Sequence, residues 1–278
     1  MQQNFTNTFI HLRKENHLTQ EQLAQELGIS AQAISKWENG QSYPDIELLP
    51  QLANLLHVSI DALLGYASQN QAIATYDSTY NISEYYWGLK PSSMCYEVMK
   101  ICPPEKKLRL IDIGCGEGKD AVFFARNGYK VSAYDISEKG IEKAKMLAER
   151  FSVNVNFFQA DIQTYRLDHE FDIVFCSGVL HYLTPNIRHE FITNIKAHTT
   201  VNGINMINVF VDKPYITKHC ATSEEESEKN SALWRAGELA TEYHDWEFYQ
   251  MYETTLDCNS GNENHKHCMD VILAERKL

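Results

Sequence analysis

Hydrophobic residues in the first part of the chain repeat at the spacing of short helices. Phe5, Phe9 and Leu12 lie three or four residues apart, which places them on one helical face. Polar capping residues such as Thr19 and Ser30 then divide the chain into further helices. Four of these are expected, over 19–27, 30–39, 44–56 and from 59 onward. The pattern predicts a small all-α domain over residues 1–66.

A different pattern begins beyond residue 104, where apolar runs alternate with amphipathic stretches. Strands are expected over 108–113, 130–136, 155–160, 171–176, 204–211, 246–256 and 268–275, and helices over 119–127 and 138–151. Such alternation is typical of a mostly parallel sheet with helices on both faces. The sequence therefore predicts a larger α/β domain over residues 91–278.

Residues 67–90 connect these two patterns. A polar linker is followed by a cluster of aromatic residues, namely Tyr76, Tyr80, Tyr85, Tyr86 and Trp87. One interpretation is a lid over a ligand, and the other is an amphipathic helix that packs its rings on the sheet. The pattern leaves both open.

Length, charge and the first residues limit where the protein acts. A chain of 278 residues favours two domains, and no apolar run approaches the roughly 20 residues that span a bilayer. Residues 1–8 lack the basic start and apolar centre of a signal peptide, so a cytoplasmic location is expected. The formal net charge of −12 disfavours broad affinity for nucleic acid. Any DNA contact must then come from a small local surface.

The cysteines indicate neither a disulfide framework nor a metal site. There are seven, they are scattered, and none belongs to a Cys-x-x-Cys pair. His265, His267 and Cys268 are close in sequence, but successive residues of a strand face opposite sides. We expect reduced thiols and no bound metal.

A glycine-rich turn follows the first expected strand. The run is Leu110-Ile111-Asp112-Ile113-Gly114-Cys115-Gly116-Glu117-Gly118-Lys119-Asp120. Glycines there let the backbone turn sharply and approach a ligand closely. The pattern is not Gly-x-Gly-x-x-Gly, and no Gly-Lys-Ser/Thr follows, so a P-loop is absent. Asp112, two positions before the first glycine, resembles the acidic residue of the motif found in methyltransferases.

Acidic residues end the next two expected strands. Asp135 suits the two hydroxyls of a ribose, and Asp161 with the Ile162 backbone suits an adenine amino group. Helix capping by both carboxylates is the alternative. Together these motifs resemble the class I S-adenosylmethionine methyltransferases, which implies a Rossmann-like sheet. The resemblance implies S-adenosyl-L-methionine as cofactor, bound by Asp112, Gly114, Gly116, Asp135, Ile136, Asp161, Ile162 and Ser177, with Tyr86 and Trp87 above it.

The amino-terminal helices also resemble a known family. The runs Leu18-Thr19-Gln20-Glu21-Gln22-Leu23-Ala24, Leu27-Gly28-Ile29-Ser30 and Ile34-Ser35-Lys36-Trp37-Glu38-Asn39-Gly40 are similar to the Cro/C1-type (XRE) helix-turn-helix family. That family places the helix over 30–39 in the major groove. The resemblance implies operator DNA as a partner, contacted by Gln20, Ser30, Gln32, Ser35 and Lys36. Gln32 suits an adenine edge.

The charge of this amino-terminal segment departs from that of a strongly basic DNA binder. Three basic and seven acidic residues over 1–66 give a balance of −4. A helical module used mainly for dimerisation is therefore the alternative. A homodimer suits either interpretation.

The residues after the fourth expected strand bear on the acceptor. Phe175-Cys176-Ser177-Gly178 is neither the Asn/Asp-Pro-Pro-aromatic nor the Pro-Cys sequence of DNA methyltransferases, so a small-molecule acceptor is expected. Tyr85-Tyr86-Trp87-Gly88 and Gly237-Glu238-Leu239, with Tyr243 and Trp246–Glu247, resemble the tellurite-resistance (TehB-like) methyltransferases. This implies tellurite, selenite or a thiol as acceptor. Val201-Asn202-Gly203 in place of Pro-Gly-Gly and the polar insert 222–231 are departures from that family.

Two catalytic side chains are expected on the acceptor side. His181 follows the fourth strand and suits removal of a proton from an acceptor such as hydrogen tellurite, or a merely structural hydrogen bond within its turn. Arg235 is the favoured cation for an oxyanion, ahead of Arg188, Lys218 and His219. The alternative function is a transcriptional regulator whose methyltransferase fold senses S-adenosylmethionine or a metabolite.

Overall fold

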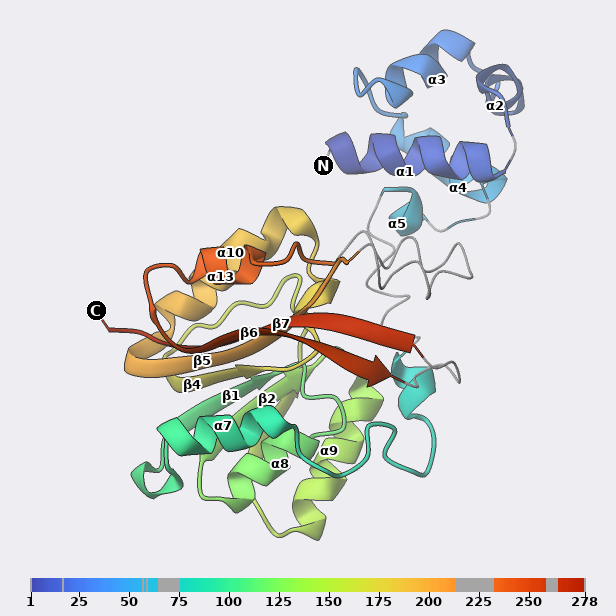
Figure 1. Cartoon of the computed structure of the whole chain (residues 1–278). Helices are drawn as coiled ribbons and strands as arrows, with labels where there is room; N and C mark the ends of the chain where they lie inside the picture. The colour runs from blue at the N-terminus through green and yellow to red at the C-terminus, as the bar shows by residue number, and fades with distance from the viewer. Residues whose placement is uncertain are drawn as a thin grey trace. The chain divides into compact units, whose positions relative to one another are not determined.

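The computed structural model describes residues 2–16, 18–56, 58, 60–64, 76–213, 233–258 and 265–277. The chain forms two compact units, Met1–Thr75 and Tyr76–Leu278 (Figure 1). The division falls within the 67–90 segment, so its aromatic residues belong to the second unit. Each unit has its own hydrophobic core.

The first unit is all-α. Its elements are α1 (Gln2–Glu15), α2 (Gln20–Leu27), α3 (Ala31–Glu38), the 3-10 turn η1 (Ile46–Leu48), α4 (Leu49–Leu55) and α5 (Ile60–Leu63). Thr19 and Gln22 form the reciprocal capping box at the start of α2, and the Ser30 hydroxyl accepts from the Ala33 amide at the start of α3. The expected fourth helix starts with a 3-10 turn before it becomes α-helical.

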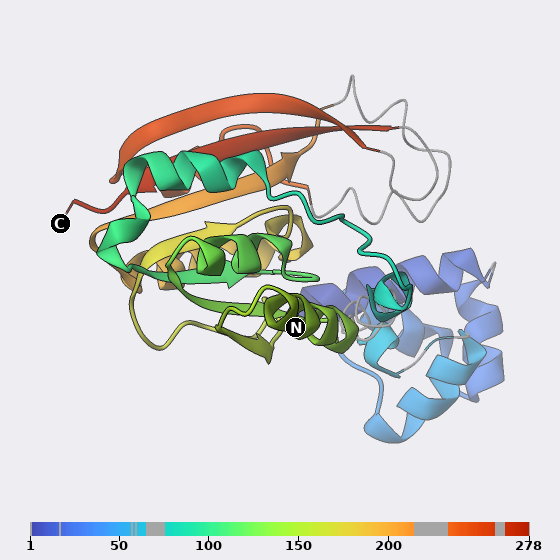
Figure 2. The same cartoon turned by 90° about the horizontal axis from the view of Figure 1, so that it is seen from below.

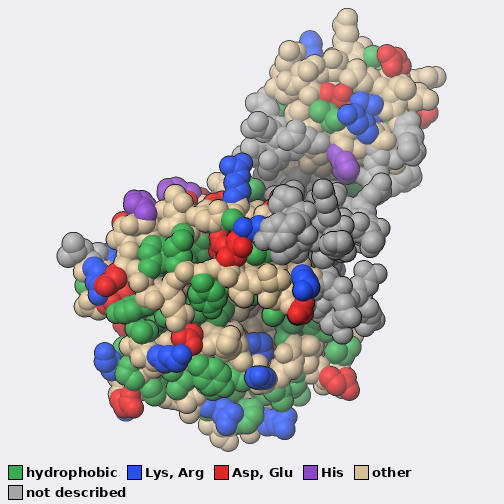
Figure 3. All heavy atoms as spheres, viewed as in Figure 1, with side chains coloured by type: hydrophobic (Ala, Val, Ile, Leu, Met, Phe, Trp, Pro, Cys, Tyr) green, Lys and Arg blue, Asp and Glu red, His purple; other side chains and the backbone are tan. Residues whose placement is uncertain are grey.

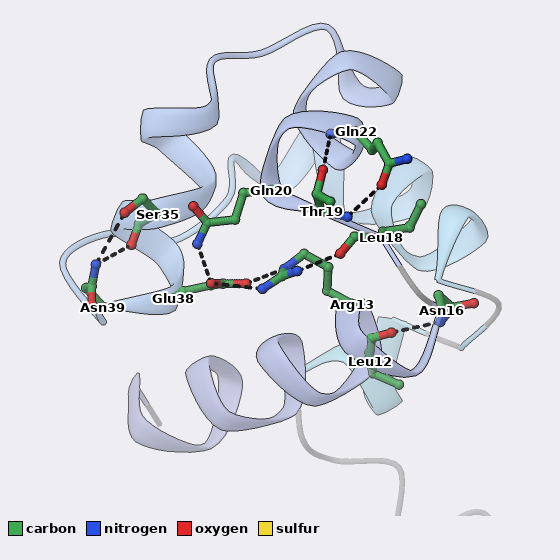
Figure 4. Close-up of polar contacts among 10 residues, drawn as sticks. All are labelled: Leu12, Arg13, Asn16, Leu18, Thr19, Gln20, Gln22, Ser35, Glu38 and Asn39. Carbon is green, nitrogen blue, oxygen red and sulfur yellow. Dashed lines mark hydrogen bonds and ion pairs between the residues drawn. The ribbon is translucent and has the colours of Figure 1, made fainter.

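A nearly buried ion pair joins two helices of this unit. The Arg13 guanidinium donates to the Glu38 carboxylate at 2.5 Å, and both side chains are only about a tenth exposed (12% and 10%). Gln20 donates to the same carboxylate from α2 at 2.5 Å, so α1, α2 and α3 meet at one acidic group (Figure 4). Phe9 and Trp37 pack edge to face below it.

The second unit is α/β. Its helices and turns are α7 (Ser93–Ile101), η2 (Pro104–Lys106), α8 (Lys119–Arg126), α9 (Glu138–Arg150), η3 (Leu180–Tyr182), α10 (Pro185–Ala197) and α13 (Glu238–Glu242). Its strands are β1 (Arg109–Ile113), β2 (Lys130–Asp135), β3 (Val155–Gln159), β4 (Phe171–Cys176), β5 (Thr199–Val211), β6 (Glu247–Cys258) and β7 (His265–Glu275). They form one sheet in the order β3-β2-β1-β4-β5-β7-β6.

Helices cover both faces of this sheet, as the sequence pattern predicts. Figures 1 and 2 show α7, α8 and α9 on one face and α10 and α13 on the other. Strand β1 is buried on both sides, because Leu110 belongs to the core beneath α8 while Ile111 and Ile113 belong to the opposite core. The predicted fold class is confirmed.

The strand order fixes where a ligand can bind. The chain runs outward from β1 through β2 to β3 and then returns to β4 on the other side of β1, so the order reverses between β1 and β4. Ligands of such sheets lie outside the carboxyl ends of the strands at this point. Strand β7 is antiparallel to β5, with Cys268 opposite Val211, so its beginning lies at the same edge.

Three further findings complete the description of this fold. The cysteines whose side chains the structure describes are buried and unpaired, namely Cys95, Cys102, Cys115, Cys176 and Cys268, and burial raises the pKa of each thiol. Among the described residues, no helix is both long and apolar enough to cross a bilayer. Within the same ranges, no group of three His, Cys, Asp or Glu side chains is arranged to hold a metal.

We expect Glu38→Ala to destabilise the first unit by about 2–4 kcal/mol, because Arg13 then keeps a nearly buried charge without its partner. Calorimetry of the full chain measures the change. Glu26→Ala, an exposed glutamate of α2, is the control and should leave the transition unchanged. Equal effects of the two substitutions would contradict a stabilising role for the ion pair.

Candidate cofactor and acceptor site

The turn between β1 and α8 lies at the point where the strand order reverses. Gly114, Gly116 and Gly118 all have positive φ, of 70°, 52° and 80°. The amides of Gly114 and Cys115 both donate to the Tyr134 carbonyl, which ties the turn to β2. A Cβ on Gly114 would lie 2.5 Å from a Val179 methyl, so this position has no room for a side chain.

Asp135 joins this turn to the end of β2. One carboxylate oxygen accepts from the Gly116 amide at 2.8 Å and the other from the Ser137 amide at 2.9 Å. The side chain is 9% exposed, and burial raises its pKa above the ordinary aspartate value despite these bonds. Ile136 follows at the strand end. Each carboxylate oxygen retains a lone pair that could accept a ligand hydroxyl.

Asp112 lies beneath the same turn and is 2% exposed. Burial, with neighbouring Asp120 as the next cause, raises its pKa well above the ordinary value. Its Oδ2 has no hydrogen-bond partner within the described part of the chain. Asp120 is held by the Lys119 ammonium at 2.7 Å and by the Ser92 amide at 2.7 Å. This stack of carboxylates makes the floor of the site acidic.

The ends of β3 and β4 contribute the remaining expected cofactor residues. The Asp161 carboxylate accepts from the Gln163 amide at 2.8 Å, so it caps the turn that follows, and Ile162 is buried beside it. Ser177 is half-buried, and the next amide, that of Gly178, donates to the side-chain oxygen of Asn208 at 2.6 Å. Capping by Asp161 is therefore present, and a role in binding stays a prediction.

The aromatic segment passes over the glycine turn. Within its described residues, 76–90, the helical part is 76–80, so a continuous amphipathic helix through Trp87 is not formed. The Trp87 indole donates to the Tyr80 hydroxyl at 3.0 Å, and both rings lie against Gly116. The Trp87 amide donates to Glu117 at 3.2 Å, and Glu117 is ion-paired with Lys143. Tyr86 packs edge-on against Trp87 and is itself exposed.

His181 lies in η3, at the edge of the sheet where β4 ends. Its ring packs at a tilt between Tyr182, at 4.0 Å between ring centroids, and Phe210 of β5, at 4.4 Å. Burial, with His267 as a further cause, lowers the pKa of His181 to about 3, so the imidazole is neutral at physiological pH. No hydrogen bond to Nδ1 forms among the described residues, so the structural bond considered for this turn is not seen at that atom.

The cations expected for an oxyanion have different surroundings. Arg188 is buried, donates to Glu238 at 3.1 Å and lies 4.6 Å from the Trp234 ring centroid. It therefore fastens the segment before α13 to α10. Arg235 is exposed, and its amide donates to Glu238 at 2.8 Å. Lys218, His219 and the insert 222–231 lie outside the described residues.

The DNA-facing residues expected in the first unit fall into two groups. Gln32 and Lys36 are exposed and one turn apart on α3. The others have local partners: Gln20 donates to Glu38, Ser30 caps α3, and Ser35 accepts from the Asn39 side chain through its carbonyl at 2.8 Å. On the face of the molecule seen in Figure 3, basic and acidic side chains are interspersed rather than gathered into one patch.

The sequence analysis missed some residues of the site. Asn208 looks like one more polar residue in a strand, yet it is 5% exposed and holds the turn after β4 through Gly178. Asp77 accepts from the Ser137 hydroxyl at 2.5 Å and so fastens the aromatic segment to the start of α9. A polar side chain within the apolar second half of a strand, as at Asn208, is the signal that finds the first of them.

Comparison with known proteins identifies the second unit. A family model described as tellurite resistance protein TehB matches residues 75–268. The chain belongs to the TehB family. A helix-turn-helix model matches residues 11–63 of the first unit, so both predicted resemblances are confirmed.

Two related proteins are consistent with membership of the TehB family. The probable S-adenosyl-L-methionine-dependent methyltransferase TehB of Haemophilus influenzae is 26% identical over 168 residues, 60% of this chain and 55% of that protein. The ubiquinone biosynthesis O-methyltransferase of Rickettsia prowazekii is 34% identical over 102 residues, 37% of this chain and 40% of that protein. The chain spans about half or less of the length of these relatives.

Solved structures show the same fold as the TehB-like unit. The crystal structure of TehB from Haemophilus influenzae has a TM-score of 0.59 and 22% identity, over 74% of this chain and 67% of that one. The N-methyltransferase NodS from Bradyrhizobium japonicum, in complex with S-adenosyl-L-homocysteine, has a TM-score of 0.53 and 14% identity, over 73% and 97%. These names agree with the predicted cofactor.

We expect Gly114→Ala to destabilise the second unit more than Gly178→Ala. Both glycines have φ of 70°, so both substitutions carry the left-handed penalty of about 1–2 kcal/mol. Only at Gly114 does the added Cβ meet another side chain, that of Val179, whereas Gly178 has open space within 4 Å. Calorimetric unfolding of the full chain measures the difference. Equal losses would show that packing against Val179 does not constrain the turn.

Proposed function

We propose that the second unit transfers the methyl group of S-adenosylmethionine to a small-molecule acceptor. The observation that supports this most directly is the bond from the Gly116 amide to Asp135, which places a glycine-rich turn beside a buried carboxylate at the reversal of strand order. A nucleoside needs such an arrangement: close backbone approach and paired acceptors for its hydroxyls.

The residues present fit this cofactor. Gly114 and Gly116 form a turn that packs closely against Val179 and Tyr80, and Asp135 is oriented by two amides. We assign Asp135 to the ribose, Asp161 and Ile162 to the adenine, and the Tyr80–Trp87 pair to the cover. The cofactor, when bound, supplies a methyl group that its positive sulfur already activates. The protein then contributes alignment and exclusion of water.

The transfer is a direct displacement. A lone pair of the acceptor forms a bond to the methyl carbon while the carbon–sulfur bond breaks and its electron pair returns to sulfur. A protonated acceptor also gives up its proton, and we propose His181 as the group that receives it. Tellurite, selenite or a thiol is the acceptor that family membership favours, and Arg235 is the cation we assign to an oxyanion.

Asp135→Asn should weaken binding of S-adenosylmethionine about tenfold or more, because at least one charge-assisted hydrogen bond to the ribose becomes a weaker neutral one. Isothermal titration calorimetry on the full chain measures this affinity. Asp172→Asn is the matched control. Asp172 lies at the amino end of β4, away from the carboxyl edge of the sheet, so this variant should bind the cofactor normally. Unchanged affinity in Asp135→Asn would remove the ribose assignment.

We also propose that the first unit binds operator DNA through α3, with two copies of the chain on two half-sites. The exposed pair Gln32 and Lys36 supports this, because a glutamine amide can read an adenine edge while a lysine contacts phosphate. The excess of seven acidic over three basic residues in 1–66 restricts this contact to a small area. The protein would use the same surface if it controlled its own gene, or if it were a regulator that senses the cofactor.

Full-length protein should select a defined sequence from a pool of random duplexes. Gln32→Ala should then lower affinity for it by about 1–3 kcal/mol and relax one base position, whereas Lys36→Gln should weaken all duplexes alike and lower the salt slope by about 1. Fluorescence anisotropy at several salt concentrations measures both. Gln25→Ala, exposed on α2, is the control. If the wild-type chain selects no sequence, dimerisation becomes the better interpretation of the first unit.

A further inference from the structure

The aromatic segment over the glycine turn is held to α9 by one lysine. The Lys143 ammonium donates to the carbonyl oxygens of Ile82 at 3.1 Å and of Glu84 at 2.5 Å. It also forms an ion pair with the Glu117 carboxylate. An ammonium has three hydrogens to donate, so these three acceptors can use all of them. Lys143 with its three acceptors, called the clamp below, therefore joins α9 to the aromatic segment and to the turn after β1.

The clamp is largely removed from water. The side chains of Lys143 and Glu117 are 13% and 2% exposed, whereas the pair that Lys139 and Glu142 form on the same helix is about half exposed. The Tyr85 hydroxyl donates to the Lys143 carbonyl at 3.2 Å, and the Tyr85 ring centroid lies 5.0 Å from the ammonium. A buried ion pair that loses one partner leaves an uncompensated charge. Opening the clamp is therefore costly, unlike breaking an ion pair on a solvated helix face.

The aromatic segment is fastened at both ends by other contacts. Near its start, the Asp77 carboxylate accepts from the Ser137 hydroxyl at 2.5 Å. Just past its end, the Ser92 amide donates to Asp120 at 2.7 Å. Residues 81–90, between these contacts, form bends and turns rather than helix, so their backbone groups need partners from elsewhere. The clamp supplies donors to two of them, and so it fixes the middle of the segment while the other contacts fix its ends.

Glu117 connects the clamp to the candidate cofactor site. One oxygen of its carboxylate faces the lysine, and the other accepts from the Trp87 amide at 3.2 Å. The Trp87 indole in turn donates to the Tyr80 hydroxyl, and both rings lie against Gly116. The Gly116 amide is the group that orients Asp135. Opening of the clamp therefore releases the two rings that lie on the turn, and leaves the bond to Asp135 in place.

We propose that Lys143 is a positioning residue whose clamp must open before S-adenosylmethionine enters or leaves its site. This inference rests on the methyltransferase function proposed above and adds a conformational step to it. None of the groups in the clamp is assigned to the cofactor, so we expect the clamp to be equally strong in the free and the bound chain. A contact of equal strength in both states cancels from the binding equilibrium but not from the barrier to opening. Weakening the clamp then raises the rates of entry and exit by the same factor.

Stopped-flow binding of S-adenosyl-L-homocysteine to the full chain, followed by tryptophan fluorescence, measures both rate constants. Lys143→Met keeps the length of the side chain and removes its charge and its donors. We expect it to raise both rate constants about tenfold, while the dissociation constant changes by less than about threefold. Lys143→Met combined with Glu117→Gln leaves no unpaired buried carboxylate, and it should behave alike if the single variant does not fold. Lys145→Met, at an exposed lysine of α9, is the control and should match the wild type.

Hydrogen exchange of the Trp87 amide, measured by NMR on the free chain, follows opening of the clamp directly. Because this amide is bonded to Glu117, it should exchange about tenfold faster in Lys143→Met than in the wild type. Unchanged exchange, unchanged binding rates, or an affinity weakened by faster exit alone would each overturn the proposal. If the wild-type chain does not bind S-adenosyl-L-homocysteine while the exchange still depends on Lys143, the proposed transferase function is wrong and the clamp stands.

Discussion

The hydrogen bond from the Gly116 amide to Asp135 is the contact on which the arrangement of the second unit's site depends. It joins the loop after β1 to the end of β2, and the Tyr134 carbonyl strengthens that junction by accepting from Gly114 and Cys115. Because the loop has no side chains on its glycines, it can lie close against Val179 on one side and Tyr80 on the other. A single amide thereby aligns three loops at the reversal of strand order. Burial, which raises the pKa of Asp135, is the energetic cost of that alignment.

In both units buried polar side chains hold separate segments of the chain together, but they hold different kinds of segment. In the first, three short helices converge on one carboxylate, Glu38, whose partners Arg13 and Gln20 come from separate helices. Helices this short have little stability of their own, so tertiary contacts must fix them. In the second unit, strand pairing fixes the backbone, and buried polar groups serve to orient loops instead. Asn208 is one such group.

Local pattern was sufficient to predict most elements but not their ends. The run Leu110–Ile113 and the glycines after it predicted β1 and its turn, because burial on both faces leaves a continuous apolar stretch. The beginning of β5 at Thr199 was missed, since its first pairing, with Phe171, is separated from the rest by a register shift. The antiparallel placement of β7 between β5 and β6 depends on long-range pairing, which periodicity does not encode.

In the candidate site, the sequence predicted those residues that directly follow a strand, because their place in the fold depends on the strand alone. Gly114, Gly116 and Asp135 follow strand ends, and strand ends of a parallel sheet meet at one edge. Arg188 illustrates the limit: a basic residue near the acceptor side is expected to be available, yet it is committed to Glu238. Partners contributed by segments fifty residues away are not visible in a one-dimensional pattern.

Because all of its cysteines lie in the second unit, the protein carries an intrinsic reporter for opening of the α/β core. All seven lie beyond residue 75, and the five whose side chains the structure describes are buried thiols with raised pKa values. Buried, protonated thiols react slowly with alkylating agents, so their labelling requires the surrounding core to open. The rate of alkylation at each of these positions therefore follows fluctuations of the α/β core alone. Unfolding of the helical unit, which contains no sulfur nucleophile, leaves no trace in such a measurement.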